Sequence, residues 1–193
     1  MFESLLIANR GEIACRIIAT VQRLGMRAIA VHSEADVGAR HVRLAQESHC
    51  IGPAPAQDSY LRGDAIIQVA LRVGASAIHP GYGFLSENAD FAQACGDAGL
   101  IFVGPSPEAI RTMGSKRVAK DLMNAAGVPV TPDYRGDDQT VETFLEQAQA
   151  LGYPIMLKPA LGGGGKGMRR VDDARNLPDA LAAAQREAQA AFG

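Results

Sequence analysis

The chain lacks any long hydrophobic run, and this absence excludes a membrane-spanning helix. Its longest apolar stretches, such as Leu5–Ala8 and Leu100–Val103, hold about four or five residues, whereas a helix needs about 20 to cross a bilayer. Charged residues also interrupt the first dozen positions at Glu3, Arg10 and Glu12, which is unlike a secretory signal peptide. We therefore expect no membrane partner.

Cysteine and histidine are scarce and scattered. The three cysteines lie far apart and form no Cys-x-x-Cys pair: Cys15, Cys50 and Cys95. No spacing typical of a metal site links the four histidines, His32, His41, His49 and His79. This pattern excludes a disulfide framework and predicts a reducing, cytosolic compartment, with no metal site in the chain.

A basic excess is missing as well. The 193 residues carry 19 basic and 21 acidic side chains, a formal net charge of −2, so we do not expect nucleic acid as a partner. Hydrophobic residues make up 47% and charged residues 21%, which excludes a disordered chain. Only four of the 19 basic residues are lysines, so the position of each lysine is informative.

Short apolar segments alternate with helical patterns through the first half of the chain. Four apolar residues after Gly11 are spaced by 4, 4 and 3 positions and so share one helix face: Ile13, Ile17, Val21 and Leu24. We expect strands at Leu5–Ala8, Arg27–Val31, Cys50–Ile51, Ala75–His79 and Leu100–Val103, and further helices near Ala39–Ala45, Ser59–Val73 and Asn88–Ala98. This alternation predicts an α/β fold, with a Rossmann-like parallel sheet in residues 1–113.

The pattern changes after Gly104, and we expect a boundary near residue 114. Residues 114–193 predict two short strands, Pro154–Lys158 and Met168–Val171, and two or three helices, the last over Leu177–Phe192. These elements are too few to close an independent sheet. We therefore expect residues 114–193 to form an incomplete second unit.

A glycine-rich segment separates the two strands expected in the second unit: Gly162, Gly163, Gly164, Gly165, Lys166 and Gly167, followed by Met168. Five glycines in six positions add unfolded-state entropy, but their bare N–H groups can close on phosphate oxygens. A Walker A loop does not fit, because no Ser or Thr follows Lys166 and a strand follows in place of a helix. The segment predicts a flap over a nucleotide, and a hairpin loop without a ligand is the alternative.

Two lysines stand where a phosphate could bind. Lys158 ends a strand of apolar residues four positions before the glycines, so its charge must leave the core or meet an anion. Lys116 lies in the first turn of an expected helix, where the partial positive charge disfavours a cation unless an anion binds there. The alternatives are a solvent-exposed lysine at a strand end and a Ser-capped helix with solvated cations.

Five motifs, in order along the whole chain, resemble the biotin carboxylase family. They are Leu6–Ala14, Ser48–Pro55, His79–Asn88, Met113–Lys116 and Gly162–Met168, and the third is the most specific. The resemblance is closest to the acyl-CoA carboxylase branch, of the methylcrotonoyl- or geranyl-CoA carboxylase type. It implies a pre-ATP-grasp N-terminal domain in residues 1–113 and the truncated start of an ATP-grasp domain, with its lid, in residues 114–193.

The same resemblance implies a chemistry and a set of ligands. The family uses MgATP to phosphorylate bicarbonate and then carboxylates biotin on a carrier domain. By this likeness Lys116, Lys158 and residues 162–168 would bind ATP. Tyr82 would line the biotin side of the site, and Glu87 would support arginines or lysines from a later segment. The implied partners are a biotin carboxyl carrier domain, a carboxyltransferase subunit and further copies of the enzyme in a homo-oligomer.

The family's catalytic centre would lie largely beyond residue 193. Its Mg²⁺-binding glutamates, bicarbonate-binding arginine and general base have no counterpart here, so these 193 residues alone are expected to be inactive. Two alternatives stay open: another ATP-grasp ligase of the carbamoyl-phosphate type, and a non-catalytic truncated module. A dinucleotide oxidoreductase is disfavoured, because Asn9-Arg10-Gly11 holds one glycine where the fingerprint needs three.

Overall fold

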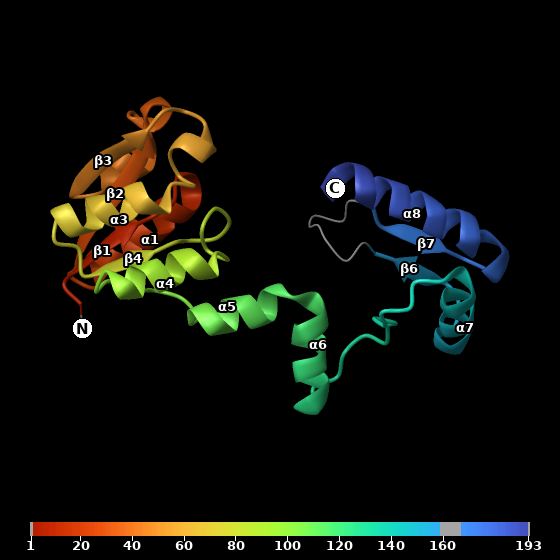
Figure 1. Cartoon of the computed structure of the whole chain (residues 1–193). Helices are drawn as coiled ribbons and strands as arrows, with labels where there is room; N and C mark the ends of the chain where they lie inside the picture. Colours follow the sequence, from red (N-terminus) through yellow and green to blue (C-terminus); the bar gives the residue numbers. More distant parts are fainter. Residues whose placement is uncertain (1, 159–166, 193) are drawn as a thin grey trace. The chain divides into compact units, whose positions relative to one another are not determined.

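The computed structural model describes residues 2–158 and 167–192 (Figure 1). It divides into two compact units, Met1–Ser115 and Lys116–Gly193, each with its own sheet. The domain functions expected for residues 1–113 and 114–193 stay predictions. No helix in the described part of the chain is long and apolar enough to cross a membrane.

Five parallel strands form the sheet of the first unit, in the order β3-β2-β1-β4-β5. The strands are β1 (Ser4–Ile7), β2 (Arg27–Ser33), β3 (Glu47–Gly52), β4 (Ala77–His79) and β5 (Ile101–Phe102). β1 lies at the centre, where Leu5 pairs with Ala28 of β2 on one side and with Ala77 of β4 on the other. The strand order therefore reverses between β1 and β4, and the expected Rossmann-like parallel sheet is confirmed.

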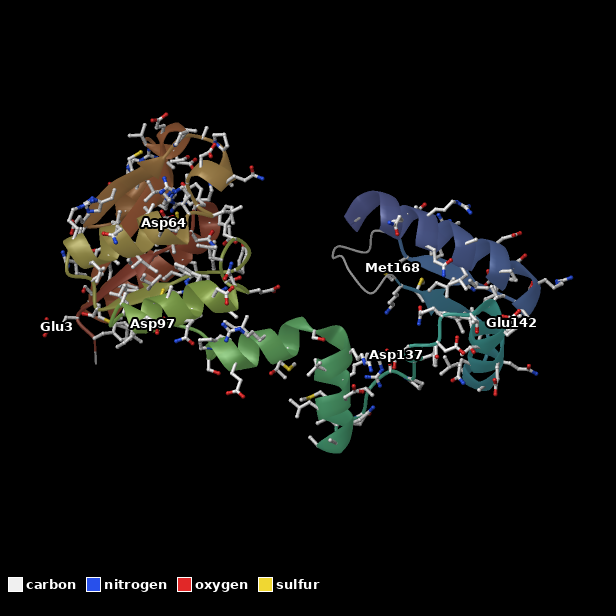
Figure 2. The ribbon with its side chains drawn as sticks, in the orientation of Figure 1. Glu3, Asp64, Asp97, Asp137, Glu142 and Met168 are labelled. Carbon is white, nitrogen blue, oxygen red and sulfur yellow. The ribbon has the colours of Figure 1, made fainter. Side chains whose placement is uncertain are left out.

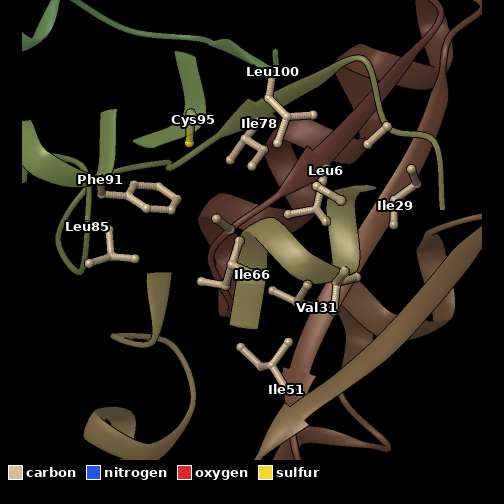
Figure 3. Close-up of a cluster of buried hydrophobic side chains, with 14 of the residues drawn as sticks. Leu6, Ile29, Val31, Ile51, Ile66, Ile78, Leu85, Phe91, Cys95 and Leu100 are labelled. Atoms are coloured by element: carbon tan, nitrogen blue, oxygen red, sulfur yellow. The ribbon is translucent and has the colours of Figure 1, made fainter. Parts of the chain in front are cut away.

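Helices cover both faces of this sheet. They are α1 (Gly11–Arg23), α2 (Arg40–Leu44), α3 (Gly63–Arg72) and α4 (Ala89–Asp97), with short 3₁₀ helices at Glu34–Asp36 and Ala56–Asp58. α5 (Pro107–Gly114) follows β5 and packs against α4. Side chains alternate along β1, so Leu5 and Ile7 pack with α1 while Leu6 packs with α3 and α4. Figure 3 shows the buried cluster that contains Leu6, in which Ile66 of α3 and Phe91 of α4 lie among the buried side chains of the strands.

The element boundaries differ most from expectation around Tyr60. β2 continues to Ser33, because His32 and Ser33 still pair with Cys50 and Gly52 of β3. The Ser33 N–H is satisfied by the Tyr60 hydroxyl at 3.0 Å. α3 begins at Gly63 instead of Ser59, because the Ser59 hydroxyl donates to the Pro55 carbonyl at 2.9 Å and holds a turn there. The first difference comes from contacts between distant residues, and the second from a side-chain turn across four residues that apolar periodicity does not contain.

The second unit has a small core of its own. α7 (Val141–Leu151) and α8 (Leu177–Phe192) pack on an antiparallel hairpin of β6 (Ile155–Leu157) and β7 (Arg169–Val171), with a 3₁₀ helix at Ala174–Asn176. The buried side chains of its core cluster are Ala148, Leu157, Val171, Leu177 and Leu181. The expectation that residues 114–193 close no sheet of their own is therefore wrong, because two strands pair and two helices bury one face of the pair.

Charges join α6 (Lys116–Ala125) to the segment that follows it. The Lys120 ammonium donates to Asp133 at 2.6 Å, and Arg135 pairs with Asp121 at 2.8 Å and with Asp133 at 2.9 Å. Leu122, on the same helix, is 48% exposed. The contact therefore includes three ion pairs, while Leu122 is left largely exposed.

Candidate functional site

The carboxyl ends of β1 and β4 meet where the strand order reverses. Open α/β sheets bind ligands at such a point, because the two connections leave in opposite directions and a crevice remains between them. Here the chain turns from β1 through Asn9 and Arg10 into α1, and β4 leads into a loop over residues 80–87. The Ala8 N–H donates to the His79 carbonyl at 2.9 Å, which keeps the two segments together as they leave the sheet.

Asn9 clamps the loop that follows β4. Its buried amide donates to the Pro80 carbonyl at 2.7 Å and to the Tyr82 carbonyl at 2.8 Å, and its Oδ1 accepts from the Arg10 N–H at 2.9 Å. Gly81 lies between these contacts with a φ of +68°, and a Cβ there would approach the Asn9 Nδ2 to 2.7 Å. The position therefore requires glycine for both its conformation and its space.

A surface hollow of about 340 Å³ lies between the two connections, lined by Asn9, Arg10, Gly11, Glu12, Ile13, Tyr82, Gly83 and Phe84. Tyr82 is 59% exposed at its rim, and its hydroxyl donates to the Glu12 carboxylate in the first turn of α1. This bond raises the pKa of the Tyr82 phenol. The phenol therefore stays protonated, and the contact orients it across the mouth of the hollow.

A polar cluster supports the hollow from below. The Arg10 guanidinium donates two bonds of 2.6 Å to Asp36, and the Tyr60 hydroxyl donates a third at 2.7 Å. The Arg10 contact lowers the pKa of Asp36 to about 2. Burial, together with the bond to Asp36, raises the pKa of Tyr60 to about 12. The cluster therefore keeps one ionised carboxylate between two donors at neutral pH.

The other predicted residues of this loop have simpler surroundings. Glu87 is exposed and lies directly before Asn88, whose side chain accepts from the Phe91 N–H at 2.9 Å and caps α4. His79 is partly buried, and its Nδ1 accepts from the Gly81 N–H at 3.0 Å. Burial lowers the pKa of His79, so the ring is neutral and serves the turn. The biotin-side roles of Tyr82 and Glu87 stay predictions.

The hairpin of the second unit has one covered and one open face. Ile155, Leu157 and Val171 pack toward α7 and α8. Met156 is 45% exposed, and its cross-strand partner is Arg170. Lys158 and Met168 occupy the next positions of this alternation and are both exposed, Met168 by 41%. Figure 2 labels the Met168 side chain. The open face thus combines two thioethers with two cationic side chains.

The predicted ATP-binding residues are only partly covered by the structure. Gly162, Gly163, Gly164, Gly165 and Lys166 lie outside the described residues. Lys116 is the first residue of α6, and its side chain also lies outside the description. Gly167 enters β7 with a φ of +74°. Of the predicted set, the structure therefore brings Lys158 and Met168 together at one end of the hairpin.

Apart from Tyr82, sequence reasoning did not assign site roles to the residues that shape the hollow. They are Asn9, Arg10, Glu12, Asp36, Tyr60 and Phe84. A signal for two of them was present, since Asn9 and Arg10 follow an expected central strand directly. Asp36 and Tyr60 gave none, because they reach the site only through side-chain contacts across 26 and 24 residues.

Metal ligands are a separate matter. Within residues 2–158 and 167–192, no group of three or more His, Cys, Asp or Glu side chains is arranged to hold a metal ion.

Comparison with protein families gives two consecutive matches. The family described as "Biotin carboxylase, N-terminal domain" matches residues 1–110, and "Carbamoyl-phosphate synthase L chain, ATP binding domain" matches residues 115–193. Among curated proteins, the mitochondrial methylcrotonoyl-CoA carboxylase subunit alpha of Oryza sativa subsp. japonica is 56% identical over 191 residues, which is 99% of this chain and 26% of that protein. The biotin carboxylase of Allochromatium vinosum is 55% identical over 193 residues, 100% of this chain and 43% of that protein.

Solved structures give the same result. A biotin carboxylase–β-γ-ATP complex from Campylobacter jejuni superposes with a TM-score of 0.90 at 47% identity, covering 100% of this chain and 43% of that chain. A second similar structure is the biotin carboxylase domain dimer of Hydrogenobacter thermophilus 2-oxoglutarate carboxylase, in complex with MgADP, ADP and bicarbonate. It superposes with a TM-score of 0.87 at 44% identity, covering 100% of this chain and 42% of that chain. The chain thus spans between about a quarter and under half of the length of these relatives.

Proposed function

Because the chain belongs to the biotin carboxylase family, we propose that it forms the N-terminal part of an ATP-dependent biotin carboxylase. In this proposal the complete enzyme phosphorylates bicarbonate with ATP and transfers the carboxyl group to carrier-bound biotin. The present residues contribute one side of the biotin site and part of the nucleotide site. The remaining catalytic groups belong to sequence beyond residue 193.

The open face of the β6–β7 hairpin is the observation that carries the proposal. Met156 and Met168 offer polarizable, apolar contacts that suit the flat face of a purine. Lys158 follows the buried Leu157 and is exposed at the end of β6, where an ammonium can meet a phosphate oxygen. The chemistry of this face therefore fits an adenine nucleotide, with residues 162–167 proposed as the flap over it.

The hollow of the first unit is proposed as the biotin side. Tyr82 presents a protonated phenol at its rim, and Glu87 is exposed in the same loop. A phenol edge and an apolar ring such as Phe84 suit a neutral ureido compound better than an anion, because Glu12 already places a carboxylate there. Mg²⁺ would neutralise the phosphate charges during transfer, and we place its ligands outside these residues.

The proposed partners follow from the relatives. The identity with methylcrotonoyl-CoA carboxylase subunit alpha favours an acyl-CoA carboxylase, with a biotin carboxyl carrier domain and a carboxyltransferase subunit as partners. A biotin carboxylase dimer among the structural neighbours favours a homo-oligomer. The cytosolic location stays a prediction, and the rice relative is a mitochondrial protein.

A second candidate is a carbamoyl-phosphate type of ATP-grasp ligase. The match of residues 115–193 to the carbamoyl-phosphate synthase ATP-binding family favours it. Residues 1–110 match a biotin carboxylase family instead, so the two candidates differ in the acceptor. Free biotin stimulates ATP hydrolysis in the first case and not in the second. A non-catalytic module would hydrolyse ATP in neither condition.

The test uses the full-length enzyme that carries these residues. We expect Lys158→Met to raise the KM for ATP by about tenfold or more in the biotin-dependent ATPase assay, because one charge-assisted phosphate contact is lost. Lys120→Met is the matched control, since Lys120 bonds to Asp133 at 2.6 Å within the same unit. Equal ATP kinetics for both variants would contradict the nucleotide assignment, and the absence of biotin stimulation in the unaltered enzyme would contradict the function.

A further inference from the structure

The loop after β4 contains a backbone conformation that needs outside support. Phe84 has a φ of +41°, in the left-handed region that bulky residues rarely adopt. Such a conformation persists only where neighbouring structure holds it, and residues of this kind concentrate at functional sites. Phe84 is also 37% exposed, so burial of its ring is incomplete.

Tyr60 is the neighbour that holds Phe84. The two rings stack with their centroids 5.1 Å apart and their planes 12° from parallel. Tyr60 is 2% exposed, and its hydroxyl is fixed at the far end of the ring, where it donates to Asp36 at 2.7 Å and accepts from the Ser33 N–H at 3.0 Å. The ring therefore forms a rigid support under an otherwise exposed loop.

The same support reaches the other wall of the hollow. Asp36 accepts two bonds of 2.6 Å from Arg10, which follows Asn9. The Arg10 guanidinium carbon also lies 5.8 Å from the centroid of the Tyr60 ring. Both walls of the hollow thus depend on the Asp36–Tyr60 pair, although neither member lines the hollow.

We propose that Tyr60, anchored by Asp36, is a positioning residue that holds residues 81–84 in the shape that presents Tyr82. Its ring acts through Phe84, and its hydroxyl fixes the ring. The link to biotin rests on the proposed function of Tyr82. The support of the loop by Tyr60 does not rest on that function, so the loop support and the link to biotin can be tested separately.

The first test measures the loop in the 193-residue chain by NMR. The Ser86 N–H donates to the Gly83 carbonyl at 2.9 Å, so its hydrogen exchange reports whether the loop is closed. We expect Tyr60→Leu to speed Ser86 exchange by about tenfold or more relative to the amides of α1, and to abolish the ring-current shifts of Phe84. Tyr60→Phe keeps the ring, so it preserves the ring-current shifts.

A matched control separates this local effect from general destabilisation. Ile18→Val removes one buried methyl group from the cluster on the opposite face of the sheet. It should change Ser86 and α1 exchange in parallel. If Tyr60→Leu also changed the exchange of Ser86 and of α1 in parallel, the positioning role would be overturned.

The second test uses the full-length carboxylase with free biotin. We expect Tyr60→Leu to raise the KM for biotin by about fivefold while the KM for ATP changes by less than about twofold, with Tyr60→Phe restoring most of the loss. A raised biotin KM in Tyr82→Ala together with an unchanged one in Tyr60→Leu would overturn the link. An unchanged biotin KM in Tyr82→Ala would refute the proposed function of Tyr82, and the exchange measurement would then decide on Tyr60.

Discussion

Replacing Gly81 with alanine should cost more stability than replacing the equivalent Gly83. Both glycines are left-handed, with φ of +68° and +66°, so each Ala variant loses about 1–2 kcal/mol from the backbone alone. At Gly81 the new Cβ would also lie 2.7 Å from the Asn9 Nδ2, whereas at Gly83 nothing lies within 4 Å. Displacing Asn9 breaks two hydrogen bonds worth about 1 kcal/mol each. We therefore expect a difference of about 2 kcal/mol between the two variants.

Urea denaturation followed by circular dichroism measures both free energies of unfolding. A double-mutant cycle identifies the cause: in an Asn9→Gly background, which also removes the Asn9 Cβ that would lie 3.1 Å from the new Cβ, Gly81→Ala should cost no more than Gly83→Ala. Equal costs for the two glycine variants in the unaltered chain would refute the clamp. So would an extra cost of Gly81→Ala that persisted after Asn9 was removed.

Three further predictions concern other parts of the chain. Burial lowers the pKa of His41 below its ordinary 6.5, so the unfolded chain binds a proton that the folded chain does not, and stability should fall as the pH drops below about 6.5. In urea titrations at several pH values, His41→Gln should make the dependence of stability on pH less steep, and an unchanged dependence would contradict this prediction. Arg135→Gln should lower the free energy of unfolding by about 1 kcal/mol, and by less in 1 M salt, because the ion pairs of Arg135 with Asp121 and Asp133 are partly exposed. A loss of stability that salt does not change would count against an electrostatic origin. Asn88→Ala should cost about 1 kcal/mol and Asn88→Ser only a few tenths in the same assay, because serine keeps the cap of α4; equal losses would exclude capping.

The order of elements was predictable because each carries a strong local pattern. α1 begins at Gly11, and Ile17 and Val21 of the expected apolar face are buried. α8 spans Leu177–Phe192 as expected. Leu24 is 56% exposed, because the helix ends at Arg23 and the face no longer reaches the sheet. Local periodicity therefore fixed element types better than element ends.

The hollow was predictable only in outline. The sequence placed Asn9 and Tyr82 in two motifs, but their contact spans 73 residues and depends on β1 and β4 being neighbours. Strand order is a property of the whole sheet, and no local pattern contains it. The stacking of Tyr60 on Phe84 depends in addition on the left-handed backbone of Phe84, which cannot be predicted from the presence of a phenylalanine in the sequence.

The central place of β1 has a consequence for the order in which the sheet is assembled during synthesis. Leu5 pairs with Ala28 and with Ala77, 23 and 72 residues further along the chain. β2 is therefore available to β1 long before β4 leaves the ribosome, and closing the shorter connection also costs less entropy. Until β4 arrives, one edge of β1, all four residues of which are buried in the finished sheet, has unpaired N–H and C=O groups, which any other extended segment can bind. β1, the central strand of the finished sheet, is thus an edge strand during part of the synthesis of the chain.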